Sequence, residues 1–129
     1  MLELNMASTS GADDAATVAM LMASAPTDPG ARMSVGRDAS RCHLVTPADW
    51  LFVSRVHLEF ACDTAGAWWV TWVRGSQDAP VSEVWLENGE RVALPYGGSH
   101  RLNSRGSGEV VIADRGGQRR VTVGWFVAP

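Results

Sequence analysis

The sequence predicts an all-β protein, a sandwich of about eleven short antiparallel strands. Residues 84–94 give the clearest signal, because two apolar runs flank an Asn-Gly pair, the dipeptide that favours a two-residue type I′ hairpin turn. Residues 67–73 are rich in Trp and Val, which suit a half-buried strand. Runs of this kind recur at spacings of about 8–12 residues, separated by Gly-rich turns, and that spacing indicates a sandwich or barrel.

The other strands are placed by the same alternation and by the turns between them. Residues 26–30, Pro-Thr-Asp-Pro-Gly, form one turn cluster, and residues 115–117, Arg-Gly-Gly, form another. Further strands are expected at residues 31–36, 42–45, 57–62, 99–102, 109–113 and 118–127.

The N-terminal third is less clear. Residues 1–15 are small and polar, so we expect a flexible tail there and a folded domain over residues 16–129. Residues 16–25 contain Ala, Met and Leu, which favour a helix by propensity. The run is short, however, ends at Pro26 and has no amphipathic stripe, so a strand stays open as the alternative.

Composition limits the classes of function. The chain has 129 residues, enough for one domain with a core, and its 46% apolar and 19% charged residues are ordinary for a globular protein. No apolar run reaches the roughly 18–20 residues of a membrane span, and no secretory signal precedes the domain. We therefore expect a cytoplasmic protein with no membrane partner.

Charge argues against nucleic acid as a partner. The net charge is -3, and residues 1–30 contain no basic residue. All 11 basic residues are Arg, and they follow this acidic segment without forming a strong basic field.

A candidate anion site lies in residues 51–60. Ser54 and Arg55 precede an alternating strand, and Gly36-Arg37 lies 17 positions before Ser54. Two guanidinium groups and a hydroxyl suit a tetrahedral dianion, because Arg offers planar, charge-assisted hydrogen bonds. The strand begins where these ligands end, so the pattern indicates an anion site at loop tips on a β scaffold.

Other reactive residues give weaker patterns. Residues 40–43, Ser-Arg-Cys-His, repeat the Ser-Arg-x-His pattern but begin three positions after Arg37, so we assign them to a solvated loop and strand start. Cys42 and Cys62 fit two free thiols better than one disulfide. The three His residues are irregularly spaced, so we expect no metal, no cofactor and no enzymatic activity.

The run Val35-Gly36-Arg37-Asp38, followed by Val53-Ser54-Arg55-Val56-His57, resembles the forkhead-associated (FHA) domain. Residues 85–94 are similar to the strand, Asn-Gly turn and strand that follow in that family. The resemblance covers roughly residues 16–129 and implies an FHA/SMAD-like antiparallel β-sandwich that binds phosphothreonine peptides on loops at one end. It also implies a strand at residues 16–25.

The resemblance assigns roles to single residues. Arg37 would steady the peptide or its phosphate, and Ser54 and Arg55 would contact the phosphate. Gly36 and His57 would support the site structurally. The partner would be a phosphothreonine-containing protein, a Ser/Thr kinase or its substrate, and the chain an adaptor in kinase signalling.

The chain departs from the family after its Trp-rich strand. Where the family usually has Gly-Ser-x-Asn-Gly-Thr, residues 75–80 are Gly-Ser-Gln-Asp-Ala-Pro. Ser76 and Gln77 can still donate hydrogen bonds, whereas ionised Asp78 would repel a dianion by about 1 kcal/mol or more. The alternative function is therefore a phosphate-independent scaffold that binds partners through exposed Trp side chains.

Overall fold

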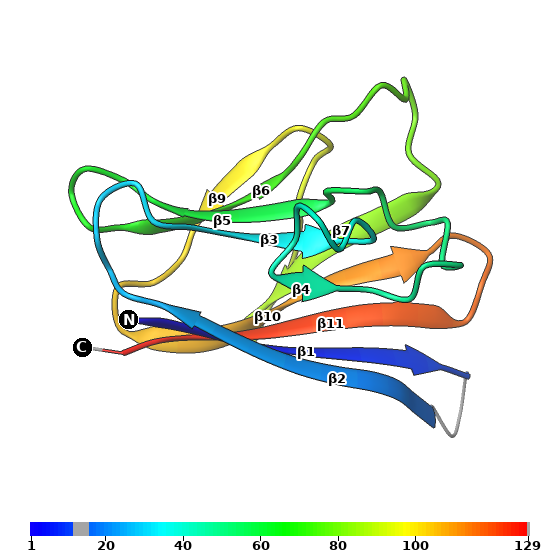
Figure 1. The fold of residues 1–129 in the computed structure, drawn as a ribbon, viewed down its shortest axis with the longest axis horizontal. Helices are drawn as coiled ribbons and strands as arrows, with labels where there is room; N and C mark the ends of the chain where they lie inside the picture. Colours follow the sequence, from blue (N-terminus) through cyan, green and yellow to red (C-terminus); the bar gives the residue numbers. More distant parts are fainter. Residues whose placement is uncertain (12–15, 129) are drawn as a thin grey trace.

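The computed structural model describes residues 1–11 and 16–128, in which eleven strands form two sheets packed face to face (Figure 1). The strands are β1 (Leu2–Ser10), β2 (Ala16–Ala25), β3 (Arg32–Gly36), β4 (Leu44–Val45), β5 (Leu58–Cys62), β6 (Trp68–Trp72), β7 (Ser82–Glu87), β8 (Arg91–Ala93), β9 (Ser99–Arg101), β10 (Gly106–Asp114) and β11 (Arg119–Val127). The predicted all-β sandwich is confirmed.

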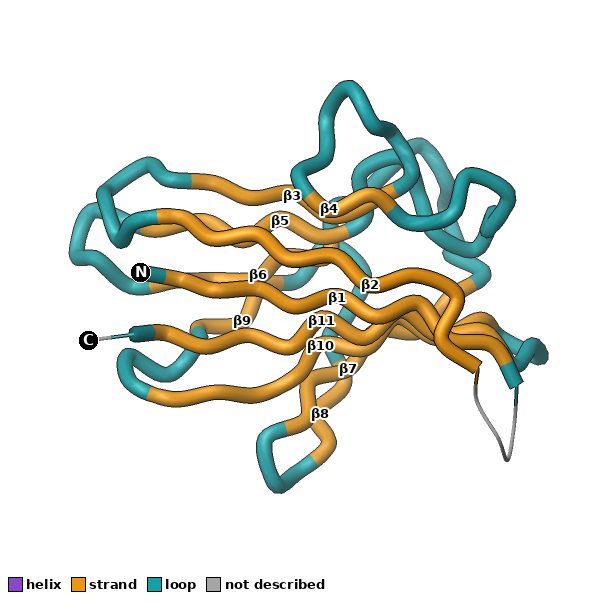
Figure 2. The backbone as a smooth tube through the Cα atoms, turned by 60° about the horizontal axis from the view of Figure 1, so that its bottom comes forward, coloured by secondary structure: helices purple, strands orange, loops and turns teal. Residues whose placement is uncertain are grey.

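The sheets have six and five strands, in the orders β2-β1-β11-β10-β7-β8 and β4-β3-β5-β6-β9. Figure 2 shows the larger sheet with β2 at one margin and β8 at the other. Neighbouring strands are antiparallel except β3 and β4, whose two-residue pairing is parallel. Across the described residues there is no helix of the length and apolarity that crossing a bilayer requires.

The N-terminus differs from the expected flexible tail. Residues 2–10 form β1, which pairs with β11 on one side and β2 on the other. Leu2, Leu4 and Met6 alternate with exposed residues and are at most 2% exposed. This period of two is the strand signal that the polar residues 8–11 obscured. The tail prediction is wrong for residues 2–10, and residues 12–15 lie outside the described part of the chain.

Residues 16–25 form a strand, β2, as the resemblance implied. A β-bulge interrupts its pairing with β1 between Ser8 and Thr9. The residues that favour a helix by propensity are overridden here by pairing with β1, because tertiary context routinely outweighs propensity.

The turn at Asn88 differs in detail from the prediction. Glu87 pairs with Arg91, so the loop has three residues rather than two. Gly89 has φ of 78°, while Asn88 keeps a negative φ, whereas a type I′ turn needs positive φ at both central residues.

Tryptophan builds the core, as the sequence indicated. Trp50, Trp68, Trp72, Trp85 and Trp125 are each at most 5% exposed. Trp69 is 37% exposed and donates its indole N–H to Asp63 (2.9 Å). Among the described residues, Trp69 is therefore the one exposed Trp that the alternative function could use.

The sandwich has two unlike ends. The N- and C-termini lie side by side at one end, where the Ala128 N–H donates to the Met1 carbonyl (2.8 Å). The strands β3 and β4 point toward the other end, where the long loops gather (Figure 1). That second end carries the candidate site.

Candidate functional site

Three loops line one open cavity of about 770 Å³. They follow β3, precede β5 and follow β6, so residues far apart in sequence come together. The lining residues are Ser34, Arg37, Arg41, Ser54, Arg55, Val56, Glu59, Val73, Arg74, Gly75, Ser76, Gln77 and Tyr96. Arg37, Ser54 and Arg55 thus share one cavity with Ser76 and Gln77.

Backbone hydrogen bonds hold the first two loops together. The N–H of Arg37 donates to the carbonyl of Ser54 (3.2 Å), and the N–H of Asp38 donates to that of Arg55 (3.0 Å). The Arg37 side chain adds a bond from its Nε to the Val53 carbonyl. The Arg37 guanidinium is therefore fixed by the loop that carries Ser54 and Arg55.

Gly36 permits this close approach. A Cβ at this position would lie 2.9 Å from the Ser54 carbonyl oxygen and 2.8 Å from the Arg55 carbonyl carbon. Real Cβ atoms essentially never approach backbone so closely, so any other residue at this position would push the two loops apart.

The buried side chain of His57 holds the backbone of Ser54 in place. Its Nδ1 accepts a hydrogen bond from the Ser54 N–H (2.9 Å). This bond assigns the ring proton to Nε2, which lies 3.4 Å from the Ser82 hydroxyl. Burial lowers the pKa of His57 to about 4, so the ring is neutral near pH 7.

The opposite wall is held by Tyr96. Its hydroxyl accepts from the Gly75 N–H (2.8 Å) and donates to the Gln77 carbonyl (3.1 Å). Its ring meets Trp72 edge-on with centroids 5.1 Å apart, and Trp72 in turn stacks on His57 at 5.5 Å. A continuous row of rings therefore braces both walls of the cavity.

The cavity is electropositive. Arg37, Arg41, Arg55 and Arg74 all line it, against one lining carboxylate among the described residues, Glu59. Glu59 is already engaged by Arg32, outside the lining, at 3.4 Å. Such an excess of guanidinium groups favours an anionic ligand.

Besides Arg37, whose Nε donates to the Val53 carbonyl, two of these four guanidinium groups are partly engaged. Arg41 lies 3.9 Å from Asp38, whose pKa is held below its usual range chiefly by hydrogen bonds from Ser40. The Arg74 guanidinium lies over the Tyr96 ring, 5.4 Å from its centroid.

Known proteins were compared at the level of sequence and of structure. Neither a protein-family model nor a curated protein sequence matches the chain. An engineered FHA domain with a Myc-pTBD peptide superposes with a TM-score of 0.62 at 17% identity, over 98% of this chain and 92% of that one. The N-terminal FHA domain of S. cerevisiae Rad53p, in complex with a phosphothreonine peptide, gives 0.58 at 13% identity, over 95% and 93%.

The chain has the forkhead-associated fold. A longer Rad53 structure with AMP-PNP contains the fold as well, with a TM-score of 0.55 at 13% identity, over 98% of this chain and 30% of that one.

Within this FHA fold, the side chain of Asp78 does not line the cavity. It is exposed, although Gln77 beside it lines the cavity. The repulsion between Asp78 and a bound dianion stays a prediction.

Arg41, Arg74 and Tyr96 are among the lining residues that were not predicted. Arg41 belongs to residues 40–43, which we assigned to a solvated loop. Arg74 follows the Trp-rich strand β6. In an antiparallel hairpin the end of β6 lies beside the start of β5, so the predicted hairpin already implied that Arg74 lies near Arg55. Tyr96 stands in a Pro-Tyr-Gly-Gly turn and gives no sequence signal of its contact with Gly75.

The thiols and metal ligands add no chemistry to the site. Cys62 is buried and Cys42 is half-buried, both free, and burial raises the pKa of each thiol. Among residues 1–11 and 16–128, no three His, Cys, Asp or Glu side chains gather as metal ligands.

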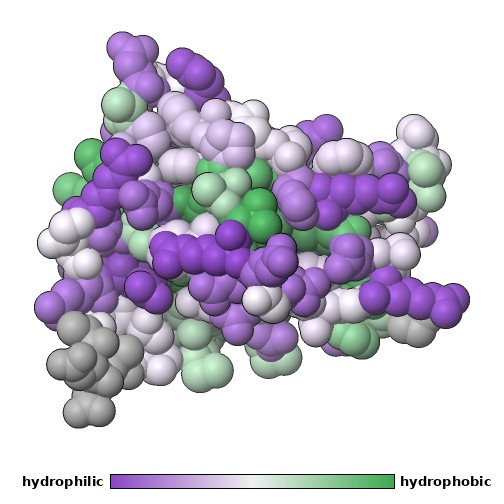
Figure 3. Space-filling model, turned by 180° about the vertical axis from the view of Figure 1, so that it is seen from behind, coloured by the Kyte–Doolittle hydropathy of each residue, from purple (hydrophilic) through white to green (hydrophobic). Residues whose placement is uncertain are grey.

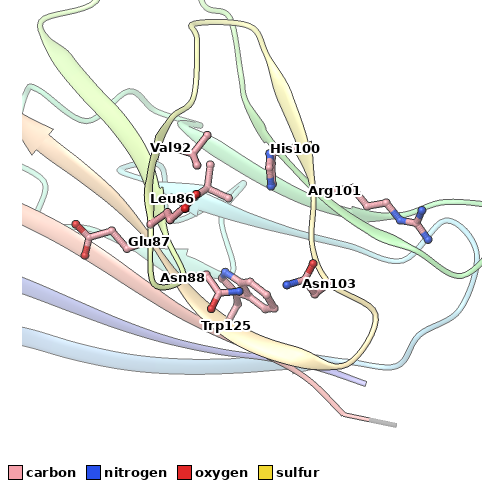
Figure 4. A pocket seen from close by; sticks show the side chains of 9 residues that line it. Leu86, Glu87, Asn88, Val92, His100, Arg101, Asn103 and Trp125 are labelled. Carbon is pink, nitrogen blue, oxygen red and sulfur yellow. The ribbon is translucent and has the colours of Figure 1, made fainter.

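A second, smaller cavity differs in charge. It has a volume of about 130 Å³ and lies between the β7–β8 hairpin, β9 and β11 (Figure 4). Glu87, Glu90 and Arg101 are the charged residues among those that line it. It therefore lacks the excess of positive charge that marks the loop cavity, and it shares no lining residue with it.

Proposed function

We propose that this chain is a phosphothreonine-peptide binding module, with the phosphate held by Arg37, Ser54 and Arg55. The observation that carries the proposal is the convergence of Arg37, from the loop after β3, with Ser54 and Arg55, from the loop before β5, on one electropositive cavity. The FHA fold supports it, because one neighbour of this fold was solved with a phosphothreonine peptide.

Each side chain has a separate task in this proposal. Arg55 is exposed at the loop tip and meets the phosphate with a planar pair of donors. The Ser54 hydroxyl donates a further bond, while its N–H is held by His57. Arg37 uses one donor on the Val53 carbonyl and keeps its remaining N–H groups for the ligand.

The second wall holds the peptide. Gln77 and Ser76 line the cavity and offer side-chain donors to the peptide backbone or the phosphate. Tyr96 fixes their loop, and Arg74 adds positive charge beside it. Such a module needs no cofactor and performs no catalysis. It would act as an adaptor in the cytoplasm, bound to a Ser/Thr kinase or its phosphorylated substrate.

A phosphopeptide array, followed by calorimetry on the best sequence, tests the proposal. Phosphothreonine peptides should bind, and their unphosphorylated forms should not. Arg55→Ala removes a charge-assisted contact and should weaken binding about 30-fold or more. The affinity of Arg55→Lys should lie between those of the wild type and Arg55→Ala. Arg105→Ala, an exposed Arg outside the cavity, is the matched control. Equal affinity for phosphorylated and unphosphorylated peptides would refute the proposal.

The second candidate is a phosphate-independent scaffold. What favours it is the sequence of residues 77–80, Gln-Asp-Ala-Pro, which replaces the usual Asn-Gly-Thr loop of the family. This candidate predicts that a partner binds the wild type and Arg55→Ala equally well, which a pull-down with both variants measures.

A further inference from the structure

The four sheet edges of the molecule are unequal. β4 has two residues, and β8 and β9 have three each. The β2 edge has ten residues, and none of them is charged. Short strands and charges are the usual protection of a sheet edge, because an edge strand offers unpaired N–H and C=O groups to any other strand. β2 lacks both forms of protection, and its one irregularity, the β-bulge at Val18, lies outside residues 19–23.

Large apolar side chains are exposed along β2. The exposed fractions are 55% for Val18, 73% for Met20, 40% for Leu21 and 80% for Met22. Apolar atoms protrude along the lower margin in Figure 3. This margin is the one at which β2 lies, because β2 is the lowest strand in Figure 1. Contiguous exposed apolar side chains on a soluble fold mark an interaction surface.

A groove accompanies these side chains. It has a volume of about 380 Å³ and is lined by Asn5, Met6 and Ala7 of β1 together with Met20, Leu21 and Met22. The exposed residues of β2 therefore form a grooved surface, and flexible Met side chains from a partner can pack into the groove.

The sequence of β2 is symmetric about Leu21. Residues 19–23 read Ala-Met-Leu-Met-Ala in both directions. In an antiparallel pair with a twofold axis at Leu21, Met20 of one copy faces Met22 of the other, and Ala19 faces Ala23. Directly opposed residues share one face of a sheet, so all four Met side chains meet on the same side. Such self-complementarity is what a twofold interface requires.

We propose that β2 pairs antiparallel with β2 of a second copy of this chain, with Leu21 on the twofold axis. The two six-stranded sheets then join edge to edge. Residues 16–25 carry no charge, so the paired strands themselves add no like-charge repulsion. A single strand pair falls at the small end of specific interfaces, below about 1,200 Å², so the dimer is concentration-dependent.

The dimer leaves both anion cavities open. No residue of β2 lines the loop cavity, so pairing there does not occupy it. Two linked sites raise the effective affinity for a ligand carrying two phosphothreonines, a gain that depends on their spacing. The dimer itself does not depend on the proposed phosphate binding.

Sedimentation velocity of the 129-residue chain, from about 1 to 300 µM, tests the proposal. We expect a monomer–dimer equilibrium within this range. Met22→Lys should weaken dimerisation at least about tenfold, because an edge Lys blocks strand pairing. Leu51→Lys is the matched control, since Leu51 is 70% exposed outside β2. A monomer at every concentration, or a dimer indifferent to Met22→Lys, overturns the proposal.

Oxidative cross-linking tests the register. Leu21→Cys places two thiols opposite each other on the axis, within reach of a disulfide. Val18→Cys is the control, because its copies lie six residues apart along the strands, about 20 Å. The wild type measures any background from Cys42 and Cys62. We expect a covalent dimer of the Leu21→Cys variant and none of the Val18→Cys variant. Equal cross-linking of the two variants would contradict the register.

Discussion

The loop end and the β2 edge are both exposed, but they prepare for binding in different ways. At the loop end, Arg37 is fixed by the Val53 carbonyl and Ser54 by His57, so charged donors are held in place before a ligand arrives. Along β2, unpaired backbone groups of an edge strand are combined with exposed Met side chains. The first surface selects charge and geometry, and the second selects an extended strand. Changes at one should therefore leave the other intact.

The largest expected effect comes from Gly36→Ala. The added Cβ collides with the backbone of Ser54 and Arg55, so we expect a loss of about 2–4 kcal/mol in the free energy of unfolding, together with loss of phosphopeptide binding. Urea denaturation and calorimetry measure the two quantities. Gly106→Ala is the control, since its Cβ would make only an ordinary contact of 3.7 Å with Asn103. Similar losses in both variants would contradict the close approach of the loops.

The second effect is a pH dependence of stability that arises at His57. Its pKa in the folded chain, about 4, lies below the ordinary 6.5, so the unfolded chain takes up the proton first as the pH falls. The stabilisation that neutral His57 contributes should be almost fully present above about pH 6.5. Relative to that plateau, the free energy of unfolding should be lower by about 2 kcal/mol at pH 5 and by about 3 kcal/mol near pH 4.

Urea titrations of the wild type and His57→Asn at pH 7 and pH 5 separate this contribution from that of the carboxylates. The variant should be less stable at pH 7 but lose less stability on acidification. An identical pH dependence in both chains would show that His57 does not cause the loss of stability at low pH.

The smallest effect comes from Tyr96→Phe. The ring and its contact with Trp72 stay, while the hydroxyl that holds Gly75 and Gln77 is removed. Each of the two lost hydrogen bonds is worth about 1 kcal/mol of stability. We expect about half of this total loss in peptide binding, which is a phosphopeptide affinity about fivefold lower. Dimerisation through β2 should stay unchanged. A larger effect on dimerisation than on peptide affinity would break the separation between the two surfaces.

Much of the fold was predictable because its signals are local. The alternation in residues 67–73 and the Asn-Gly pair at 88–89 depend only on neighbouring residues, and both correspond to strands and a turn in the structure. The pairing of Arg37 with residues 54–55 was proposed from the resemblance and from two short motifs. The structure brings these residues to one cavity.

What was missed depends on contacts between distant residues. Residues 2–10 form a strand because β11 and β2 flank them, although the polar residues at their end suggest a tail. Tyr96 contacts Gly75 across 21 positions, and no local pattern reports that contact. The position of Asp78 outside the cavity likewise follows from the path of its loop rather than from its residue type.

An NMR titration of the ¹⁵N-labelled chain with a phosphothreonine peptide tests the central claim most directly. Amide signals of Arg37, Ser54, Arg55 and Gln77 should shift, while those of Met20 and Met22 in β2 should not. The unphosphorylated peptide should leave the same signals unchanged. Shifts that are equal for both peptides, or that map to β2 instead of the loops, would contradict the account.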